Sequence, residues 1–312
     1  MGPIHLAVKT KELLDRTLEQ DQGASYRRML KVVLPHIEDA YRGEDSPFRS
    51  HLGASVLGGS CARAIWYGFR WATTPSFKGR VLRLFNRGHL EEGRIISLLL
   101  CAGIQVFQQD ENGHQFRISE LGGHLGGSGD GVAVGIPDLQ PGAPCLLEFK
   151  THNDASFKKL VKEGVRSAKF EHFIQMQTYM RKMQLPVALY VGCNKNDDDL
   201  HLELVYLDAA FADQYLDRGR QIIMMRHPPK KLHTSAGWYE CKWCDHRPVC
   251  HLKANPNKNC RTCQWSIARE DGKWYCTHPE HDANHLELTK EDQLKGCDDY
   301  EVISDSTTSI PN

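Results

Sequence analysis

The sequence predicts an α/β or α+β fold, in which a mixed sheet is flanked by helices and followed by a small cysteine-rich appendage. Helical spacing of apolar residues runs through 9–42 and again through 80–103, and between 104 and 149 the period changes to that of short strands. Past Pro228 and Pro229 this periodicity fades into short segments rich in Cys, His and Trp. The chain has 312 residues, 40% of them hydrophobic, which is enough apolar material for one substantial core.

The elements before the sheet are expected to be helical. Residues 9–42 form a helical N-terminal arm, interrupted at the Gly23 turn, with a kink expected at Pro35. A Gly/Ser-rich stretch then leads into a short helix carrying Cys61. The segment RVLRLFNRGHLEEGRIISLLLCAG predicts a strongly amphipathic helix that ends at Gly103.

Four strands are expected next, with the sequences IQVFQQ, HQFRIS, GDGVAVG and PCLLEFK, because Gly, Pro and Asn turn signals separate them. Residues 156–184 return to helical spacing, VALYVGCN and LHLELVYL predict two more strands, and AAFADQYLDRGRQIIMMR predicts a closing helix. Helices then cover a mixed sheet. The expected division is a helical arm at 1–54, a core domain at 55–252 and a small Cys-rich module with a frayed tail at 253–312.

Charge and hydropathy exclude little. Lys plus Arg equal Asp plus Glu at 39 each, so a nucleic-acid surface would have to come from local clustering. No run reaches the roughly 18 uncharged apolar residues of a membrane span, and the N-terminus lacks a signal-peptide pattern. The expected location is the cytoplasm, where the 11 cysteines are unlikely to form a disulfide framework, so their spacing points to metal.

Acidic residues on two successive strands form the strongest candidate site. Asp130 stands just ahead of one strand, and Glu148 and Lys150 lie on the next. Because side chains alternate along a strand, Glu148 and Lys150 share one face. Converging carboxylates suit a hard divalent cation such as Mg²⁺, and a neighbouring Lys could orient a water nucleophile. An isolated E-x-K is usually an ordinary solvated strand end, so the interpretation depends on its context.

That context is an ordered set of motifs: a helix with RGHLEE, the pattern D-x17-E-x-K, and a helix with QMQTY. The order resembles the PD-(D/E)xK nuclease superfamily, in particular its RecB-type and lambda-exonuclease-like branch, over roughly residues 55–250. The resemblance implies a restriction-endonuclease-like core. One departure is that Ser128 and Gly129, and no proline, precede Asp130.

The resemblance also implies roles for individual residues. Glu92, with His89 as the competing candidate, Asp130 and Glu148 would be Mg²⁺ or Mn²⁺ ligands, joined by the backbone carbonyl of Phe149. Lys150 would be the catalytic lysine. The Q-x3-Y motif would place Gln175 and Tyr179 beside the active site. His172 is expected at the surface or behind the residues that touch substrate.

A basic run follows the active-site strand and contains the candidate DNA-backbone contacts Lys158, Lys159, Lys162, Arg166 and Lys169. Such a run is more often a solvated helix face. Trp66, Phe69 and Trp71 offer rings that could stack on bases, although core packing is the better expectation for at least two of them.

Two cysteine sets carry metal-ligand spacing. Cys241, Cys244 and Cys250 form C-x2-C-x5-C and lack a fourth nearby thiol, while Cys61 lies far upstream. This arrangement resembles the iron-sulfur nucleases of the same superfamily, the AddB-type subunits and the CRISPR-adaptation nucleases, and implies a structural 4Fe-4S cluster. Spacing alone leaves Zn²⁺ open.

The second set, Cys260, Cys263 and Cys276, has the C-x2-C-x12-C spacing of a zinc ribbon. Cys297 is the expected fourth Zn²⁺ ligand and His278 the alternative. A small module without a core of its own needs such a staple.

The favoured function is a metal-dependent DNA nuclease, expected to be an exonuclease acting on single- or double-stranded DNA ends in recombination, replication or repair. The stand-alone layout resembles phage or prophage recombination nucleases, which implies a single-strand annealing or recombination protein as partner and the bacterial host cytoplasm as location. Two alternatives stay open at this point: a non-catalytic DNA-binding scaffold that keeps the fold, and a redox-sensing regulator built on the cluster. Polarity of cleavage, exo- against endonuclease action and oligomeric state are not determined by the sequence.

Overall fold

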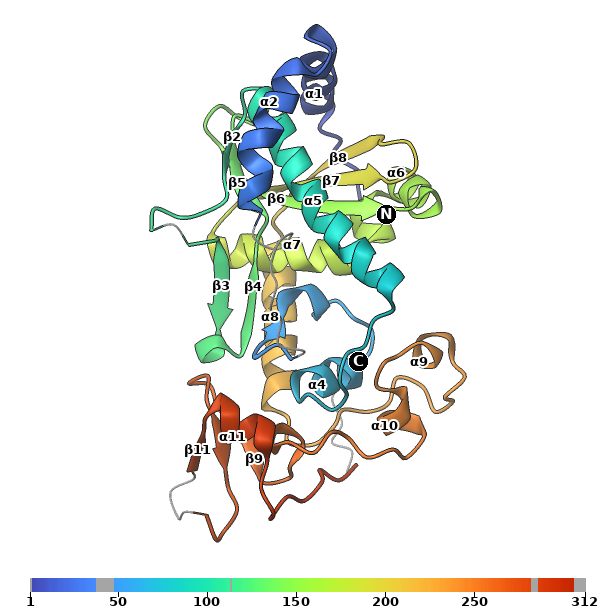
Figure 1. The fold of residues 1–312 in the computed structure, drawn as a ribbon, viewed down its shortest axis with the longest axis vertical. Helices are drawn as coiled ribbons and strands as arrows, with labels where there is room; N and C mark the ends of the chain where they lie inside the picture. Colours follow the sequence, from blue (N-terminus) through green and yellow to red (C-terminus); the bar gives the residue numbers. More distant parts are fainter. Residues whose placement is uncertain (1, 38–47, 113, 282–285, 306–312) are drawn as a thin grey trace. The chain divides into compact units, whose positions relative to one another are not determined.

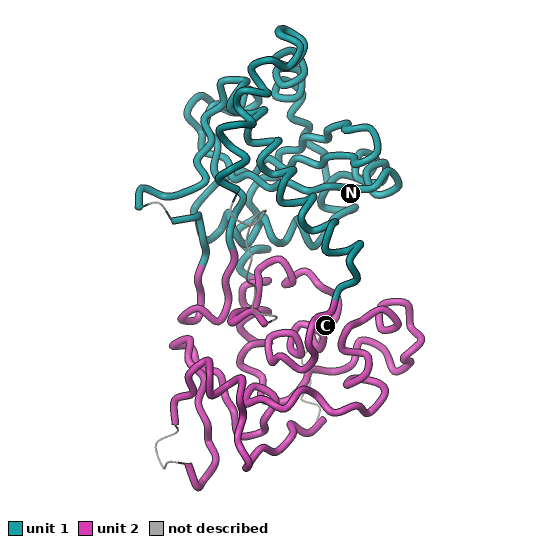
Figure 2. Tube along the Cα trace, viewed as in Figure 1, with its two compact units in different colours: residues 1–45, 77–118, 128–213 teal, residues 46–76, 119–127, 214–312 magenta. Residues whose placement is uncertain are grey.

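The computed structural model describes residues 2–37, 48–112, 114–281 and 286–305. The chain divides into two compact units, which are drawn in teal and magenta in Figure 2. Unit 1 comprises residues 1–45, 77–118 and 128–213, and unit 2 comprises residues 46–76, 119–127 and 214–312. The division at 1–54, 55–252 and 253–312 stays a prediction. No helix of the described residues is long and apolar enough to cross a membrane.

Unit 1 is built on one mixed sheet of five strands in the order β2-β5-β6-β7-β8. The strands are β2 (Gln105–Phe107), β5 (Gly131–Val134), β6 (Pro144–His152), β7 (Val187–Asn194) and β8 (Leu200–Tyr206). All neighbours pair antiparallel except β6 and β7, which are parallel. Parallel neighbours need a crossover, and α6 (Asp154–Ala168) with α7 (Phe170–Met183) supply it.

The two faces of this sheet are covered by different helices. Alternate residues of β6, Cys145, Leu147 and Phe149, join the apolar core together with residues of α1 (Val8–Gln20), α2 (Ala24–Val33) and α5 (Gly79–Cys101). The helices α2 and α5 lie side by side (Figure 1). The other residues of β6 face α6 and α7, and Glu148 and Lys150 are on that face.

Unit 2 contains short elements. They are β1 (Leu52–Gly53), α4 (Ala62–Phe69), α9 (Tyr239–Lys242), α10 (Arg247–His251), β9 (Ser266–Ala268), β10 (Trp274–Cys276), β11 (Leu286–Leu288) and α11 (Lys290–Lys295). Unit 2 also has 3-10 turns at Ala54–Val56, Leu121–Gly123 and Cys260–Thr262, and unit 1 has one at Leu34–His36. Three more elements have residues in both units: β3 (Arg117–Glu120), β4 (Leu125–Ser128) and α8 (Ala209–Met224). One three-stranded sheet has the order β1-β4-β3 and the other β11-β10-β9.

Stacked cations and aromatic rings hold the interior of unit 2 together. The Arg261 guanidinium lies 3.7 Å from the centroid of the Trp71 ring and 4.8 Å from that of Trp274. Arg70 stacks over Trp66 at 4.7 Å. Burial lowers the pKa of both arginines to about 9, and their N–H groups donate to backbone carbonyls, including Arg261 to Phe69. Because Trp66, Phe69 and Trp71 are buried here, they serve packing and not base stacking.

The predicted fold class, a mixed sheet flanked by helices with a Cys-rich C-terminal part, is confirmed. The expected strands and helices appear with shifts of a few residues. For example, HQFRIS begins its strand only at Arg117, and Cys61 caps α4 without being inside it. The strand β4 was not predicted, because its sequence LGGS has the composition of a turn. Residues 38–42 of the expected N-terminal arm lie outside the described residues.

Candidate active site

Glu148 and Lys150 extend from β6 toward the helices of the crossover. Glu148 pairs in register with Tyr190 of β7, and Lys150 pairs with Gly192. The Glu148 side chain is 0% exposed and that of Lys150 is 28% exposed, and the carboxylate and the ammonium form an ion pair. Glu148 and Lys150 thus lie on one face of β6, as the two-residue period of a strand predicts, and their charged groups are in contact there.

Asp130 lies immediately before β5 and is fixed by the backbone of the neighbouring strand. Its Oδ2 accepts a hydrogen bond from the Phe149 amide at 2.7 Å. The next residue, Gly131, has φ of +152°, and a Cβ there would stand 2.9 Å from the Phe107 carbonyl oxygen. Glycine is required at this position, which explains the second glycine of the G-D-G sequence without any reference to metal.

The charged groups of the cluster shift one another's pKa values. Burial raises the pKa of Asp130 well above its ordinary value, and the nearby carboxylates of Glu148 and Glu92 add to this rise. Burial also raises the pKa of Glu148, although Lys150 opposes the rise. For Lys150 burial works against the ammonium, but Glu148 and Asp130 outweigh it and the pKa is raised. The site therefore has more negative charge than one lysine balances, which is the condition a divalent cation relieves.

Glu92 and His89 both belong to α5, and His89 Nδ1 lies 3.7 Å from Glu92 Oε1. Both are about a third exposed. The neighbouring Glu91 differs: it is buried and its Oε2 accepts from Arg94 at 2.9 Å. Of the two glutamates in the HLEE sequence, Glu92 is thus the one whose charge acts on Asp130, Glu148 and Lys150. The competition between Glu92 and His89 as ligand stays open.

The helix α7 covers the site with the Q-x3-Y residues. Gln175 is buried, and its amide donates to Glu148 Oε2 at 3.3 Å. Tyr179 lies one turn further on the same face and is 3% exposed. Burial, followed by the charges of Glu148 and Asp130, raises the pKa of Tyr179, so its hydroxyl stays protonated. The helix therefore brings one amide and one hydroxyl to the carboxylates.

A neighbouring cluster of two histidines and a tyrosine was missed in the sequence. His152 lies two residues after Lys150 on the same face of β6. Its Nε2 lies 2.9 Å from the Tyr190 hydroxyl, and the same hydroxyl lies 2.9 Å from Nδ1 of His172 on α7. The alternation Glu148-Lys150-His152 was a signal for the first of these residues; the part played by Tyr190 depends on the β6–β7 register, which no local pattern gives.

Both imidazoles of this cluster stay neutral near pH 7. Burial, aided by the charges of Lys169 and Lys195, lowers the pKa of His152 to about 4. Burial and the charge of Lys150 lower the pKa of His172 to about 3. His172 was expected at the surface or behind the residues that touch substrate, and it lies half-buried beside Lys150.

The basic run predicted for DNA contacts lies on α6 and just after it. Lys158 pairs with Asp154 at 2.8 Å, and Lys159 pairs with Glu163 at 3.8 Å. The Arg166 guanidinium lies 5.1 Å from the centroid of the Phe173 ring. Lys162 is exposed and Lys169 half-buried. The surface is basic but partly neutralised, and its contact with DNA stays a prediction.

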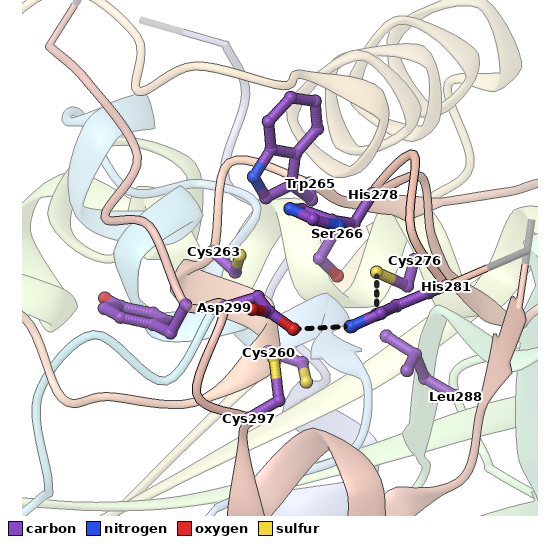
Figure 3. A pocket seen from close by; sticks show the side chains of 11 residues that line it. Cys260, Cys263, Trp265, Ser266, Cys276, His278, His281, Leu288, Cys297 and Asp299 are labelled. Carbon is purple, nitrogen blue, oxygen red and sulfur yellow. Dashed lines mark hydrogen bonds and ion pairs between the residues drawn. The ribbon is translucent and has the colours of Figure 1, made fainter.

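Each of the two cysteine sets lines one pocket of unit 2. The first pocket is lined by Cys61, Cys241, Cys244 and Cys250 together with Arg63, Tyr67 and His246. Burial and then the Cys61 charge raise the pKa of the Cys241 thiol. Burial also raises the pKa of the Cys244 and Cys250 thiols. The second pocket is lined by Cys260, Cys263, Cys276 and Cys297, together with His278, His281 and Asp299 (Figure 3). Cysteines distant in sequence thus line the same pocket in both cases.

Comparison with known proteins gives likenesses in structure only. No family model matches the sequence, and no curated protein matches it. The chain is similar to the crystal structure of an alkaline exonuclease, LHK-Exo, from Laribacter hongkongensis, with 14% identity and a TM-score of 0.40 over 63% of this chain and 90% of the exonuclease. The structure of LHK-Exo in complex with dAMP gives 18% identity and a TM-score of 0.41 over 55% and 86%.

A third similar structure, that of the protein SSO0001, gives 15% identity and a TM-score of 0.40 over 75% of this chain and 99% of that protein. Likenesses at this level do not carry function.

Proposed function

We propose that the protein is a divalent-metal-dependent DNA nuclease that hydrolyses phosphodiester bonds, acting as an exonuclease on DNA ends. The observation that carries the proposal is the convergence of Asp130, Glu148 and Lys150 on one face of the sheet, with the Gln175 amide on Glu148. A structural ion pair alone would not account for a second, half-buried carboxylate beside the first, where burial and then the charge of Glu148 raise the pKa of Asp130.

The donor set fits Mg²⁺ or Mn²⁺. Asp130, Glu148 and Glu92 offer carboxylate oxygens and Phe149 a backbone carbonyl, which are the hard ligands that both ions accept. When bound, such an ion supplies an activated water and charge neutralisation for the phosphoryl group. His89 is the alternative ligand on α5.

The chain's own residues have separable tasks in hydrolysis. Lys150, charged at neutral pH, orients the attacking water and balances negative charge that develops on the phosphate. Gln175 holds Glu148 in place through its amide. Burial and the charges of Glu148 and Asp130 keep the Tyr179 hydroxyl protonated, so it is available to donate a hydrogen bond to a bound phosphate or water. Lys158, Lys159, Lys162, Arg166 and Lys169 would attract the DNA backbone without reading sequence.

The first cysteine pocket supports a structural 4Fe-4S cluster held by Cys61, Cys241, Cys244 and Cys250. Cys61 precedes α4 and the other three follow α8, so a cluster would join segments about 180 residues apart in sequence. The test is iron and acid-labile sulfide analysis of anaerobically purified protein. About four of each per chain, lost in Cys61→Ser, supports the cluster, and zinc in their place contradicts it.

The activity test uses end-labelled linear duplex, linear single strands and covalently closed circular DNA. We expect release of mononucleotides or short products from linear DNA with Mg²⁺ or Mn²⁺ and none with chelator. Asp130→Asn should remove activity while the amide oxygen keeps the hydrogen bond from Phe149. Cleavage of closed circles at the rate of linear DNA would contradict exonuclease action, and full activity of Asp130→Asn would contradict the site. Biological context follows as part of the proposal: recombination, replication or repair, together with a single-strand annealing or recombination protein.

A further inference from the structure

A pocket of unit 2 that is lined by four cysteines, two histidines and an aspartate suggests a second metal centre. In the sequence, these residues lie far from those proposed for nuclease chemistry. Cys260 begins the 3-10 turn Cys260–Thr262 and Cys263 follows it, Cys276 ends β10, and Cys297 follows α11. Three separate backbone segments thus deliver four sulfur atoms to one pocket (Figure 3).

The four thiols line one pocket of unit 2. Cys263 and Cys276 are buried there, and Cys260 and Cys297 are half-buried. Thiolates gathered in one pocket need a cation, and a soft tetrahedral ion such as Zn²⁺ is the one that they prefer.

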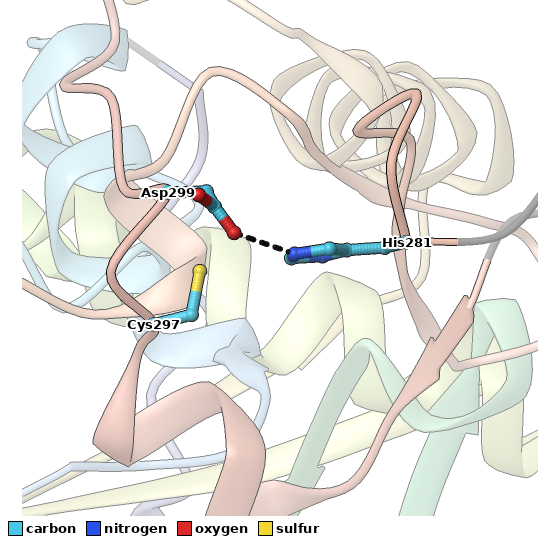
Figure 4. A group of neighbouring side chains, drawn as sticks. All are labelled: His281, Cys297 and Asp299. Carbon is cyan, nitrogen blue, oxygen red and sulfur yellow. Dashed lines mark hydrogen bonds and ion pairs between the residues drawn. The ribbon is translucent and has the colours of Figure 1, made fainter.

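His281 and Asp299 lie against this group in an ordered way. His281 Nδ1 is 3.3 Å from Cys276 Sγ, and its Nε2 is 2.8 Å from Asp299 Oδ2. The ligand atoms of His281, Cys297 and Asp299 all lie within 4.8 Å of one another (Figure 4). Both ring nitrogens of His281 therefore have partners. His278 is engaged elsewhere, since its Nδ1 accepts from the Glu280 amide at 3.3 Å.

We propose that Cys260, Cys263, Cys276 and Cys297 bind one structural Zn²⁺, and that His281, held by Asp299, donates a hydrogen bond to the Cys276 thiolate from outside the ligand set. An N–H group on a zinc-bound thiolate offsets part of the negative charge that four thiolates bring to one ion. The pair His281–Asp299 is thus a positioning device for the metal and takes no part in chemistry.

The local fold shows why the module needs the ion. The strands β9, β10 and β11 have three residues each, and within the described residues of this sheet the buried apolar side chains are few, Trp274 and Leu288 among them. A sheet this small is marginal without a cross-link. Arg261, between two of the ligands, stacks on Trp71 and donates to the Phe69 carbonyl, so the ion also fixes a contact with α4.

The ligand set is tested on the unmodified, full-length protein by zinc-edge X-ray absorption, which does not see iron. We expect four sulfur neighbours at about 2.3 Å. A shell of three sulfurs and one nitrogen would overturn the ligand assignment, because it would place a histidine of the pocket, His278 or His281, on the metal. Protein that contains no zinc when purified from zinc-supplemented medium would overturn the site.

Variants test the individual roles through metal content and zinc release. Cys297→Ser should lower zinc by one per chain, while Cys101→Ser, a half-buried thiol of α5, should leave it unchanged. His281→Ala and Asp299→Asn should keep one zinc but weaken its affinity roughly 10- to 100-fold in chelator competition. Unchanged affinity in both would overturn the outer role of the pair. Full zinc in Cys297→Ser with none in His281→Ala would overturn the ligand set. All of these readouts are independent of DNA cleavage, so they hold or fail separately from the nuclease proposal.

Discussion

The ion pair between Glu148 and Lys150 allows a sharp test, because removing one partner leaves the other without compensation. The Glu148 side chain is 0% exposed, whereas Lys150 keeps 28% of its side chain exposed. In Lys150→Met the apolar part of the side chain is preserved and only the charge is lost. Glu148 keeps its hydrogen bond from Gln175 but has lost its cation.

The expected cost follows from that geometry. Breaking a fully buried pair costs about 3–5 kcal/mol, and the partial exposure of Lys150 reduces this to about 2–4 kcal/mol. The pKa of Glu148 is already raised by burial despite Lys150, so in the variant it rises further and the carboxyl takes up a proton as the pH falls. The penalty should therefore be largest near pH 8 and smaller near pH 5.

The assay is urea unfolding of metal-free protein at both pH values, extended to a double-mutant cycle. Lys150→Met with Glu148→Gln removes both charges, and the double variant should recover at least half of the lost stability. Lys158→Met is the matched control, because Lys158 is an exposed lysine in a surface pair, and its removal should leave the free energy of unfolding essentially unchanged. Equal stability of Lys150→Met and the parent at pH 8 would refute the reasoning, as would a double variant no more stable than Lys150→Met.

Three further predictions concern folding. The folded-state pKa of His152 is lowered to about 4, so the unfolded chain binds a proton first as the pH falls below about 6.5, and this histidine should cost the folded protein up to about 3 kcal/mol between there and pH 4. His172, whose pKa is lowered to about 3, adds to the loss over the same range, so His152→Gln should reduce the slope of stability against pH without removing it. An unchanged slope would contradict the assignment. In Gly192→Ala the new Cβ would lie 2.7 Å from Leu160 Cδ2. This clash should lower the free energy of unfolding, measured in urea, by about 1–3 kcal/mol. An unchanged free energy would show that Leu160 on α6 moves aside at no cost. Gly88→Ala is the opposite case, since a Cβ there meets nothing within 4 Å. Because alanine favours the helix over glycine, the free energy of unfolding should rise by about 0.5–1 kcal/mol. A lower free energy of unfolding would mean that the glycine has another role.

How far the sequence could predict this structure depended on the range of each interaction. The pairing of Glu148 with Lys150 follows from the two-residue period of a strand, and Gln175 with Tyr179 from helical spacing, so local patterns were sufficient. The fold class followed in the same way, since the helical and strand periods are strong in unit 1. The interpretation of the E-x-K pattern needed its context, because the pattern alone is common.

Other features depend on contacts that no local pattern encodes. Tyr190 joins His152 and His172 only because β6 and β7 pair in one register across a crossover of two helices. The hydrogen bond from the Phe149 amide to Asp130 likewise depends on the pairing of β5 with β6. His281 was not singled out, although it lies five residues after Cys276, because its importance comes from Asp299 as a partner. The cysteine spacing predicted metal but could not rank histidines around the pocket.

The central claim, that the Asp130, Glu148 and Lys150 cluster is a nuclease centre, is tested most directly by single-turnover cleavage of end-labelled linear DNA. Parent, Lys150→Met and Lys11→Met are compared at saturating Mg²⁺ or Mn²⁺, at a temperature where all three are folded by circular dichroism; Lys11 is a lysine of α1 that pairs with Asp199. We expect Lys150→Met to fall at least about 100-fold while Lys11→Met stays within about threefold of the parent. Cleavage by Lys150→Met at the parental rate, or a parent that cleaves nothing with either metal, would contradict it.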